Sequence, residues 1–397
     1  MDLLNELKKR KLIYQTTPNI EDFFKKKGTL YLGIDPTSDS LHLGNYLGLS
    51  LLKRFYLNDF KVIIILGGGT AKIGDPSGKV KERPILPLEV LENNKKKIKK
   101  QISKFLPIDN KKVKLIDNSK WLDNLKLMEF LRDIGKFVSI NSMLDLEFVK
   151  ERLNAQEMMS FAEFTYQLLQ AYDFYVLFEK YDCQLQIGGS DQWGNIIQGI
   201  ELIRKKTNQE AYGLVYPLLI DPKTGRKFGK TEAGETLWLD PQKFHPFRLY
   251  QFLINHDDNF AKDLLYFYSF RSLEEIEKTI EESERNKELR IVQKKLAEEL
   301  ILSLYGKKTL NQVLEITNIL FNKDFDTLTL KEIKILKNAI PTKKVNKNTP
   351  LEEMLVELNL AKSKSEARNL LNSIKILKRG NYLLIKKGKK DFGLAEF

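Results

Sequence analysis

Cysteine and histidine are scarce in this sequence, and long apolar runs are missing from it. Its 397 residues include one cysteine, Cys183, and three histidines. A single cysteine excludes an intrachain disulfide and a metal site built on several thiolates, so we expect a buried thiol. No apolar run approaches the roughly 18 residues of a membrane span. The N-terminal segment carries Asp2 and Glu6 and lacks the apolar core of a signal peptide, which predicts a reducing, cytoplasmic compartment and no membrane partner.

Basic residues outnumber acidic ones. There are 66 Lys and Arg against 53 Asp and Glu, and the formal net charge is +13. This excess favours a polyanionic partner, with nucleic acid ahead of an acidic membrane surface. A biased genome also produces lysine-rich chains, so charge alone does not decide. The length predicts two or three domains rather than one core.

Strand-like segments in the first 220 residues end in short loops. "KVIIILGGG" (61–69) is an apolar run followed by glycines, typical of a parallel strand buried on both faces. "CQLQIGGSDQWGN" (183–195) ends in the same way, and "YLGIDP" (31–36) breaks at an Asp-Pro pair. Strand, loop and helix in this order indicate a βαβ fold, in which ligands bind at the carboxyl ends of the strands. We therefore expect these three loops to meet at one sheet edge.

"HLGN" (42–45) places a histidine where a helix is expected to begin. A helix N-terminus attracts phosphate through its free N–H groups, and His42 there can donate to a phosphate oxygen. Gly44 would let a base or a sugar approach the backbone. A partly buried histidine that satisfies only its own hydrogen bonds explains these four letters equally well.

"GGGTAKIGDPSGKVKER" (67–83) sets the carboxylate of Asp75 among five glycines, with the cations Lys79 and Arg83 nearby. Two cations four residues apart suit one side of a helix and can neutralise phosphate charge. A solvated surface turn would explain the cations, although it does not explain a carboxylate inside a glycine-rich loop at a strand end.

The segment "FAEFTYQLLQAYDFYVLF" (161–178) predicts a helix that is apolar almost all round and therefore largely buried. Tyr166, Gln170 and Asp173 nevertheless share one face, at spacings of four and three residues. Burying these groups costs free energy unless each is paired. A small polar ligand would pair them, and so would an internal hydrogen-bond network.

Two further loops contain groups that suit a nucleotide. In "IGGSDQWGN" (187–195), Gly189 lets the backbone approach a ribose and Asp191 suits a diol. "KFGKT" (227–231) has two lysines, a glycine and a hydroxyl, which together make a phosphate clamp. Either loop alone is common on protein surfaces.

Taken in order, these strings resemble a known family. "HLGN" resembles the HIGH signature and "KFGKT" the KMSKS signature of class I aminoacyl-tRNA synthetases. "YLGIDPTSDSLHLGN", "IGDPSGK", "FTYQLLQAYDF", "LQIGGSDQWGN" and "KFGKTEAGETLWLD" resemble the tyrosyl-tRNA synthetases of the bacterial or organellar type. The resemblance covers residues 1 to about 320 and less of the remainder. Asn45 replaces the second histidine of the HIGH signature, and we expect a retuned ligand contact there.

The resemblance implies a role for each matching residue. Tyr31 and Asp173 match the pair that holds the hydroxyl group of the substrate phenol. The residues that match contacts to the ammonium and carboxylate groups of the amino acid are Asp75, Tyr166, Gln170, Gln186 and Gln192. The residues that match nucleotide contacts are Asp35, His42, Gly44, Asn45, Gly189, Asp191 and Lys230. The residues that match groups acting on the departing pyrophosphate are Thr37, His42, Lys79, Arg83, Lys227, Lys230 and Thr231.

The implied activity is that of a tyrosine–tRNA ligase, which forms tyrosyl-adenylate and then charges the tRNA. Its implied ligands are L-tyrosine, tyrosine tRNA and ATP with Mg²⁺, the ion bridging phosphates rather than occupying a protein metal site. The family also implies a homodimer. One alternative is an RNA-binding protein descended from a synthetase, against which the complete set of pocket residues argues. Another is the related tryptophan enzyme, although Tyr31 and Asp173 favour a phenol over an indole.

These observations predict an α/β fold with a helical unit and a small terminal module. The expected parts are a Rossmann-like parallel-sheet catalytic domain over 1–220, a KMSKS-type loop connection over 221–247, an α-helical domain on the anticodon side over 248–320, a polar linker over 321–349 and a short α+β RNA-binding module over 350–397. Residues 341–397 contain 13 Lys and Arg against 6 Asp and Glu, a net charge of +7. That charge fits a tRNA-binding surface and also a solvated tail.

Overall fold

The computed structural model describes residues 2–77, 84–222, 225, 228–231 and 234–397. They form two compact units. The first contains residues 1–239 and 263–277, and the second contains residues 240–262 and 278–397. Within the described residues, no helix is both long enough and apolar enough to cross a bilayer.

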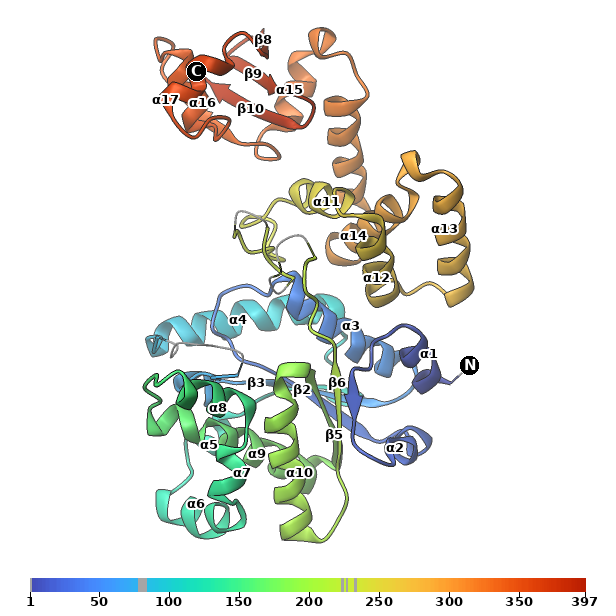
Figure 1. Ribbon diagram of the computed structural model, residues 1–397, viewed down its shortest axis with the longest axis vertical. Helices are drawn as coiled ribbons and strands as arrows, with labels where there is room; N and C mark the ends of the chain where they lie inside the picture. The colour runs from blue at the N-terminus through green and yellow to red at the C-terminus, as the bar shows by residue number, and fades with distance from the viewer. Residues whose placement is uncertain (1, 78–83, 223–224, 226–227, 232–233) are drawn as a thin grey trace. The chain divides into compact units, whose positions relative to one another are not determined.

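A six-stranded sheet forms the centre of the first unit (Figure 1). The strands lie in the order β1-β6-β5-β2-β3-β4, and every neighbouring pair is parallel except β1 with β6. Their bounds are β1 (Gln15–Thr16), β2 (Thr29–Ile34), β3 (Lys61–Leu66), β4 (Val113–Asp117), β5 (Cys183–Gly189) and β6 (Tyr212–Tyr216). The predicted Rossmann-like parallel sheet is therefore confirmed.

Helices cover both faces of this sheet, with α3 and α4 on one side and α9 and α10 on the other (Figure 1). Because both faces are covered, β3 is buried from Val62 to Leu66, as its unbroken apolar run predicts. Cys183 at the start of β5 is buried in the core, also as predicted. The helices of this unit that precede residue 239 are α1 (Leu3–Lys9), α2 (Ile20–Lys26), α3 (Leu43–Leu57), η1 (Thr70–Lys72), α4 (Leu88–Phe105), α5 (Ser119–Leu122), α6 (Leu127–Asp133), η2 (Gly135–Phe137), α7 (Ile140–Leu144), α8 (Glu147–Asn154), α9 (Phe161–Tyr181), η3 (Ser190–Gln192) and α10 (Trp193–Thr207).

The strand order reverses between β2 and β5. From β2 the chain continues to β3 and β4 on one side of the sheet, whereas β5 is followed by β6 on the other side. Connections that diverge in this way leave a crevice at the carboxyl ends of the two central strands. The loops after Ile34 and Gly189 open into that crevice.

Residues 263–277 return to the first unit and are held there by two buried arginines. Arg10 and Arg54 both donate to the carbonyl oxygen of Ser269, and both pair with the carboxylate of Glu6. Burial lowers the pKa of Arg54 to about 9, and the neighbouring Arg10 contributes to that shift. This returning segment is therefore an integral part of the first unit.

Helices make up the first part of the second unit, as the periodicity predicts. They are α11 (Pro246–Ile254), α12 (Asp258–Tyr268), α13 (Leu273–Arg285), η4 (Lys287–Leu289) and α14 (Ile291–Phe321), and parts of α12 and α13 belong to the returning segment. Gly306 interrupts α14 with a φ of 84°, a conformation that glycine adopts readily.

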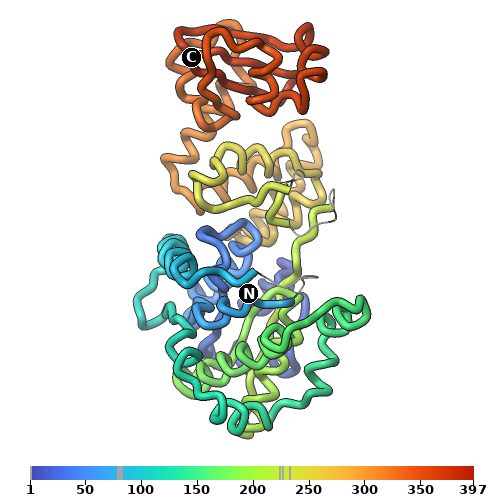
Figure 2. The backbone as a smooth tube through the Cα atoms, turned by 90° about the vertical axis from the view of Figure 1, so that its left-hand side faces the viewer, coloured from blue at the N-terminus to red at the C-terminus, as the bar shows by residue number. Residues whose placement is uncertain are grey.

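The C-terminal residues form a four-stranded sheet in the order β7-β10-β9-β8, traced in red in Figure 2. Its strands are β7 (Thr342–Lys344), β8 (Ile374–Arg379), β9 (Tyr382–Lys387) and β10 (Asp391–Glu396), and α16 (Leu351–Glu357) and α17 (Lys364–Leu370) pack on it. Residues 321–349, expected as a polar linker, contain η5 (Phe325–Thr327), α15 (Leu330–Leu336) and β7. Because β7 pairs with β10, part of that expected linker belongs to the C-terminal sheet.

Candidate active site

A pocket of about 540 Å³ lies at the point where the strand order reverses. Side chains from β2, α3, the loop after β3, α9, β5 and the segment after β6 line it. The residues predicted from sequence that line this one pocket are Tyr31, Asp35, Thr37, His42, Gly44, Asn45, Asp75, Tyr166, Gln170, Asp173, Gln186, Gly189, Asp191, Gln192 and Lys230. The structure thus brings together loops that are far apart in sequence, as the βαβ pattern predicts.

Asp173 on α9 is buried deep in the pocket wall. Its Oδ1 accepts a hydrogen bond from Trp121 Nε1 (2.7 Å), and its Oδ2 accepts one from Asn118 Nδ2 (2.8 Å). Burial raises the pKa of this carboxyl group to about 7, and the two donors partly oppose the rise. The site therefore holds a carboxyl group that titrates near neutral pH.

Tyr31 on β2 faces the same region. Its hydroxyl group is buried and has no hydrogen-bond partner among the described residues, and the same is true of Gln186 Oε1 on the neighbouring strand. Burial and the adjacent Asp173 raise the pKa of the Tyr31 hydroxyl well above its usual value. A buried polar atom without a partner is costly, and a ligand hydroxyl group placed here would remove that cost.

A second polar cluster surrounds Asp75. Its Oδ1 accepts from the backbone N–H of Ser77 (2.9 Å), and its Oδ2 accepts from Gln192 Nε2 (2.8 Å). Asn195 on α10 donates to Gln170 Oε1 (3.0 Å) and to Ser77 Oγ (3.1 Å). The cluster presents several oxygen acceptors around one carboxylate, which is suited to a cation such as an ammonium group.

Tyr166 joins this cluster to the end of β2. Its hydroxyl group donates to Asp35 Oδ2 (2.9 Å), so its oxygen can still accept a hydrogen bond from a ligand. Burial, followed by Asp35 and Asp75, raises the pKa of Tyr166 well above its usual value. The phenol therefore stays neutral at physiological pH.

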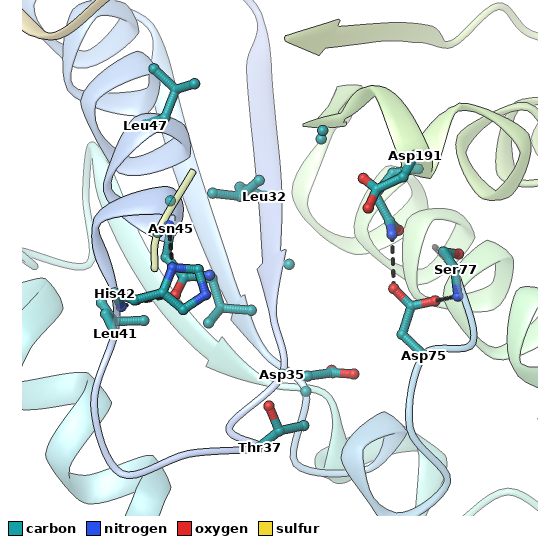
Figure 3. A pocket seen from close by; sticks show the side chains of 18 of the residues that line it. Leu32, Asp35, Thr37, Leu41, His42, Asn45, Leu47, Asp75, Ser77 and Asp191 are labelled. Atoms are coloured by element: carbon teal, nitrogen blue, oxygen red, sulfur yellow. Dashed lines mark hydrogen bonds between the residues drawn. The ribbon is translucent and has the colours of Figure 1, made fainter. Parts of the chain in front are cut away.

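His42 and Asn45 cap α3 reciprocally (Figure 3). The backbone N–H of Asn45 donates to His42 Nδ1 (3.2 Å), and the backbone N–H of His42 donates to Asn45 Oδ1 (3.1 Å). Since Nδ1 is an acceptor, the neutral ring carries its hydrogen on Nε2. The amide of Asn45 is oriented in the same way, with its oxygen on the backbone and its NH₂ group remaining as a donor. Capping thus explains why an asparagine fits at this position.

The segment after β6 pairs with the start of α3. The backbone N–H of Leu43 donates to Leu237 O (3.0 Å), and that of Leu239 donates to Leu41 O (2.8 Å). This pairing brings the "FGKT" part of the loop to His42, where Lys230 lines the pocket. Thr231 instead accepts a hydrogen bond within its own loop, from the backbone N–H of Glu235 (3.1 Å), and is not a lining residue.

Three residues predicted from sequence, Lys79, Arg83 and Lys227, lie outside the described residues. Thr37 and Asp35 lie at the end of β2, across the pocket from Asp75, Ser77 and Asp191 (Figure 3). A Cβ atom on Gly189 would lie 2.8 Å from Asp191 Oδ1, so the glycine makes room for that carboxylate.

Sequence reasoning missed several polar residues in or directly behind the pocket wall, and sequence signals existed for two of them. Asn118 directly follows β4 and so lies at the same sheet edge as the other loops. Thr70 directly follows the three glycines after β3. The missed residues that hydrogen bond to predicted ones are Thr70, Ser77, Asn118, Trp121 and Asn195. Among the described residues, no group of three or more His, Cys, Asp or Glu side chains could hold a metal ion.

Comparison with known proteins gives one consistent result. A family model for class I tRNA synthetases (W and Y) matches residues 25–322. The tyrosine–tRNA ligase of Roseiflexus castenholzii is 41% identical over 378 residues, which cover 93% of this chain and 89% of that protein. The tyrosine–tRNA ligase of Oenococcus oeni is 40% identical over 421 residues, which cover the whole of both.

A solved structure is also similar. A C-terminally truncated mitochondrial tyrosyl-tRNA synthetase from Aspergillus nidulans has a TM-score of 0.71 and 30% sequence identity, with coverage of 79% of this chain and 92% of that one. The family match spans most of the chain, and the relatives extend over nearly all of it. The chain therefore belongs to the class I tRNA synthetases and, among them, to the bacterial-type tyrosyl-tRNA synthetases.

Proposed function

We propose that this chain activates L-tyrosine with ATP and then transfers the tyrosyl group to the terminal adenosine of its tRNA. The observation that supports this most directly is the buried pair of Tyr31 and Asp173 in a pocket whose other polar cluster suits an ammonium group. A phenol and an ammonium group are the two ends of tyrosine. Tyrosine-dependent exchange between ATP and pyrophosphate, followed by charging of a matched tRNA, tests the proposal. A folded protein that shows no exchange would contradict it.

Tyr31 and Asp173 are proposed to recognise the phenol hydroxyl group. The Tyr31 hydroxyl group has no partner among the described residues, and Asp173 is already oriented by Asn118 and Trp121. A bound phenol can donate to the Asp173 carboxylate and accept from Tyr31. Phenylalanine would leave Tyr31 and Asp173 without these bonds, so the same contacts discriminate against it.

The cluster around Asp75 is proposed to hold the substrate ammonium group through Asp75, Tyr166 and Gln170. Asp75 supplies the charge, while the oxygen atoms of Tyr166 and Gln170 supply neutral acceptors. Gln186 and Gln192 line the same pocket and are proposed to contact the rest of the amino acid. With both ends held, the substrate carboxylate has few orientations left, which favours its attack on ATP.

The opposite part of the pocket is proposed to bind ATP, which would enter as its Mg²⁺ complex. Asp35, Gly44, Asn45, Gly189 and Asp191 would contact the nucleoside. The groups proposed to act on the pyrophosphate are Thr37, His42, Lys79, Arg83, Lys227, Lys230 and Thr231. His42 is suited to this role because it caps the N-terminus of α3 and lines the pocket beside Lys230.

In the proposed reaction, a carboxylate oxygen of tyrosine attacks the α-phosphorus while the bond to the β-phosphate oxygen breaks, and pyrophosphate leaves. No side chain acts as a nucleophile. The protein contributes by positioning both substrates and by stabilising the charge that grows on the leaving group. A hydroxyl group of the terminal adenosine then attacks the tyrosyl carbonyl carbon, and AMP leaves.

The raised pKa of Asp173 predicts how selectivity depends on pH. The ionised carboxylate accepts from Asn118, Trp121 and the phenol together, whereas the protonated form must donate one hydrogen. Since this pKa is about 7, the ratio of kcat/KM for tyrosine to that for phenylalanine should rise through pH 7, and at pH 6 it should be about one-tenth of its plateau. The ratio cancels titrations that affect both substrates equally.

Exchange rates with both amino acids between pH 5.5 and 8.5 measure this dependence. A flat ratio in the unaltered enzyme would contradict the assignment, and the variant Asp173→Asn should give a flat ratio. Stability should show the opposite trend. A carboxyl group whose pKa rises on folding favours the folded state below its ordinary pKa of 3.8, and this contribution is lost as the pH rises through about 7.

The C-terminal module is proposed to bind tRNA, supported by its net charge of +7 over residues 341–397. A chain that ends at Asn322 should keep tyrosine-dependent exchange within about threefold and lose charging by about 100-fold, because phosphate contacts dominate RNA affinity. The cut lies before α15 because Arg379 on β8 donates to Leu328 O (3.0 Å), which ties the preceding residues to the module. Unchanged charging by this chain would exclude the role, and its exchange rate is the internal control.

A homodimer is proposed on the basis of an apolar surface on the first unit. The segment from α6 to the start of α9 carries large apolar side chains that are mostly exposed to solvent. These are Leu127, Met128, Ile140, Leu153, Met158 and Phe161. A second copy of the chain would remove this surface from water. For an enzyme that charges tRNA, we also propose the cytoplasm as its location.

The RNA-binding alternative is not favoured. A protein that only bound RNA would have no use for Asp173 and Tyr31 buried beside an amino-acid-sized pocket. The tryptophan alternative is also weaker, since an indole offers one N–H donor and no acceptor for the Tyr31 hydroxyl group.

A further inference from the structure

Thr70 is a buried hydroxyl-bearing residue that none of the proposed roles includes. It begins η1 directly after the three glycines that follow β3, and 3% of its surface is exposed. Its hydroxyl group donates to Asp35 Oδ1 (2.8 Å) and accepts from Asn118 Nδ2 (3.1 Å). Thr70 thus connects two residues that come from different strand ends.

Asn118 has a fixed orientation. One hydrogen of its NH₂ group is donated to Thr70 and the other to Asp173 Oδ2 (2.8 Å), while its oxygen accepts from the backbone N–H of Gly69 (2.7 Å). A flipped amide would turn its oxygen toward the Asp173 carboxylate and leave that N–H unpaired. Each hydrogen bond of this side chain therefore supports the other two.

The carboxylate of Asp35 accepts hydrogen bonds from two hydroxyl groups. Thr70 donates to its Oδ1, and Tyr166 donates to its Oδ2 (2.9 Å). The five side chains form an unbroken series of hydrogen bonds, which we call the polar relay: Asp173, Asn118, Thr70, Asp35 and Tyr166. One end of the relay lies where the phenol is proposed to bind, and the other end lies where the ammonium group is proposed to bind.

We propose that Thr70 is a positioning residue that couples recognition of the tyrosine hydroxyl group to recognition of its ammonium group. The proposal rests on the binding roles given above to Asp173 and Tyr166. Without the Thr70 hydroxyl group, Asn118 loses the partner that orients its NH₂ group toward Asp173, and Asp35 loses the hydrogen bond that Thr70 donates to it. Both ends of the substrate site are then less precisely held.

The glycine loop leaves room for the relay. A Cβ atom on Gly67 would lie 1.8 Å from Asp35 Oδ1 and 2.4 Å from Thr70 Oγ1, and one on Gly69 would lie 3.3 Å from Asn118 Oδ1. A side chain at Gly67 would therefore clash with both atoms and prevent the hydrogen bond between Thr70 and Asp35. The glycines after β3 thus leave space for the side chains of Asp35, Thr70 and Asn118.

The first test compares Thr70→Val, which keeps the shape of the side chain and removes its hydroxyl group, with Thr70→Ser, which keeps the hydroxyl group. For Thr70→Val we expect the ratio of kcat/KM for tyrosine to that for phenylalanine to fall by about tenfold, because a bond to a group that orients a carboxylate is lost. The KM for tyrosine should rise, and the KM for ATP should change by less than about twofold. Thr70→Ser should restore the ratio to within about threefold.

A second test does not depend on Thr70→Val folding. Tyr166→Phe removes a contact that both amino acids would make at the ammonium end, so without the relay their ratio should not change. With the relay, the ratio should fall by roughly threefold, since the loss reaches Asp173 through Asp35, Thr70 and Asn118. Gln170→Ala is the matched control, because Gln170 is proposed to bind the same ammonium group but belongs to the Asp75 cluster and not to the relay.

Pyrophosphate exchange with both amino acids, on full-length protein with melting temperatures recorded, supplies every value. The unaltered enzyme tests the proposed function, and the variants test only the relay. An unchanged ratio in folded Thr70→Val overturns the proposal. If Thr70→Val does not fold, an unchanged ratio in Tyr166→Phe overturns it, as does an equal fall in Tyr166→Phe and Gln170→Ala. A fall in Tyr166→Phe alone, absent from Gln170→Ala, supports it.

Discussion

Replacement of Asp173 by alanine is expected to lower kcat/KM for tyrosine by about 10-fold to 150-fold, while kcat/KM for phenylalanine changes far less. The variant loses a charged acceptor for the phenol hydroxyl group, a bond of about 1.5–3 kcal/mol, and it leaves Asn118 and Trp121 as donors without an acceptor. Phenylalanine brings no hydroxyl group and therefore loses little. The selectivity of the enzyme should fall together with its activity.

The unpaired N–H groups of Asn118 and Trp121 can also destabilise the variant, so the loss of activity has to be separated from a loss of stability. A buried cavity beside unpaired N–H groups lowers stability, so the melting temperature of Asp173→Ala has to be measured with its kinetics. Asp173→Asn fills the space and keeps one acceptor, so it should fold better and still lose most selectivity. Unchanged exchange kinetics with tyrosine in either folded variant would show that Asp173 does not recognise the phenol.

Replacement of His42 by alanine is expected to lower kcat for adenylate formation by about 100-fold to 1,000-fold, the usual effect of removing one hydrogen-bond donor to a growing negative charge. The proposed contact acts on the departing pyrophosphate and not on tyrosine. The KM for tyrosine should therefore change little, and the loss should appear in the rate of the chemical step. Single-turnover formation of tyrosyl-adenylate measures that rate directly.

His42 also caps α3, so a structural effect has to be separated from a catalytic one. Loss of an N-cap acceptor costs about 1 kcal/mol of stability. His42→Asn keeps a good N-cap residue and shortens the reach of the donor. We expect it to retain stability and still lose much of kcat. If this variant kept the full rate, the ring of His42 would be a capping group and no more.

The position of the pocket was predictable because the ends of the central strands can be recognised in the sequence. Apolar runs that end in glycine or Asp-Pro indicated β2, β3 and β5, and parallel packing forces their carboxyl ends to one edge. The spacing of Tyr166, Gln170 and Asp173 on one helical face was equally local information. Strand ends and helix faces are set by residues close together in the sequence, and both are found in the structure as predicted.

Contacts between distant segments were not predictable in this way. Asn118 and Trp121 reach Asp173 across more than 50 residues of sequence. The place of Asn118 after β4 indicates its sheet edge, but no local pattern identifies Asp173 as its partner. The three glycines after β3 suggest space for phosphate, whereas the structure fills part of that space with the side chains of Asp35 and Asp117. Tertiary packing decides which side chain fills the space beside a glycine, and this cannot be predicted from the local sequence.

The polar composition of residues 321–349 predicts a linker, yet α15 and β7 form there. Polar residues are common in short elements with one exposed side. Thr329 and Glu332 form a capping box that begins α15, and β7 is set by its pairing with β10. The capping box was visible as a Thr-x-x-Glu spacing, but the strand needed a partner about 50 residues away.

Because residues 263–277 complete the first unit, the catalytic part of this enzyme is not encoded by one continuous stretch of its gene. A fragment ending at Leu239 would keep Arg10 and Arg54 but lose the Ser269 carbonyl oxygen to which both donate. The shortest self-sufficient catalytic fragment should therefore extend to Glu277 and carry the intervening helices with it. A recombination event that replaced the second unit would also replace residues 263–277, which bind Arg10 and Arg54 of the first unit. We therefore expect the two units to be inherited together.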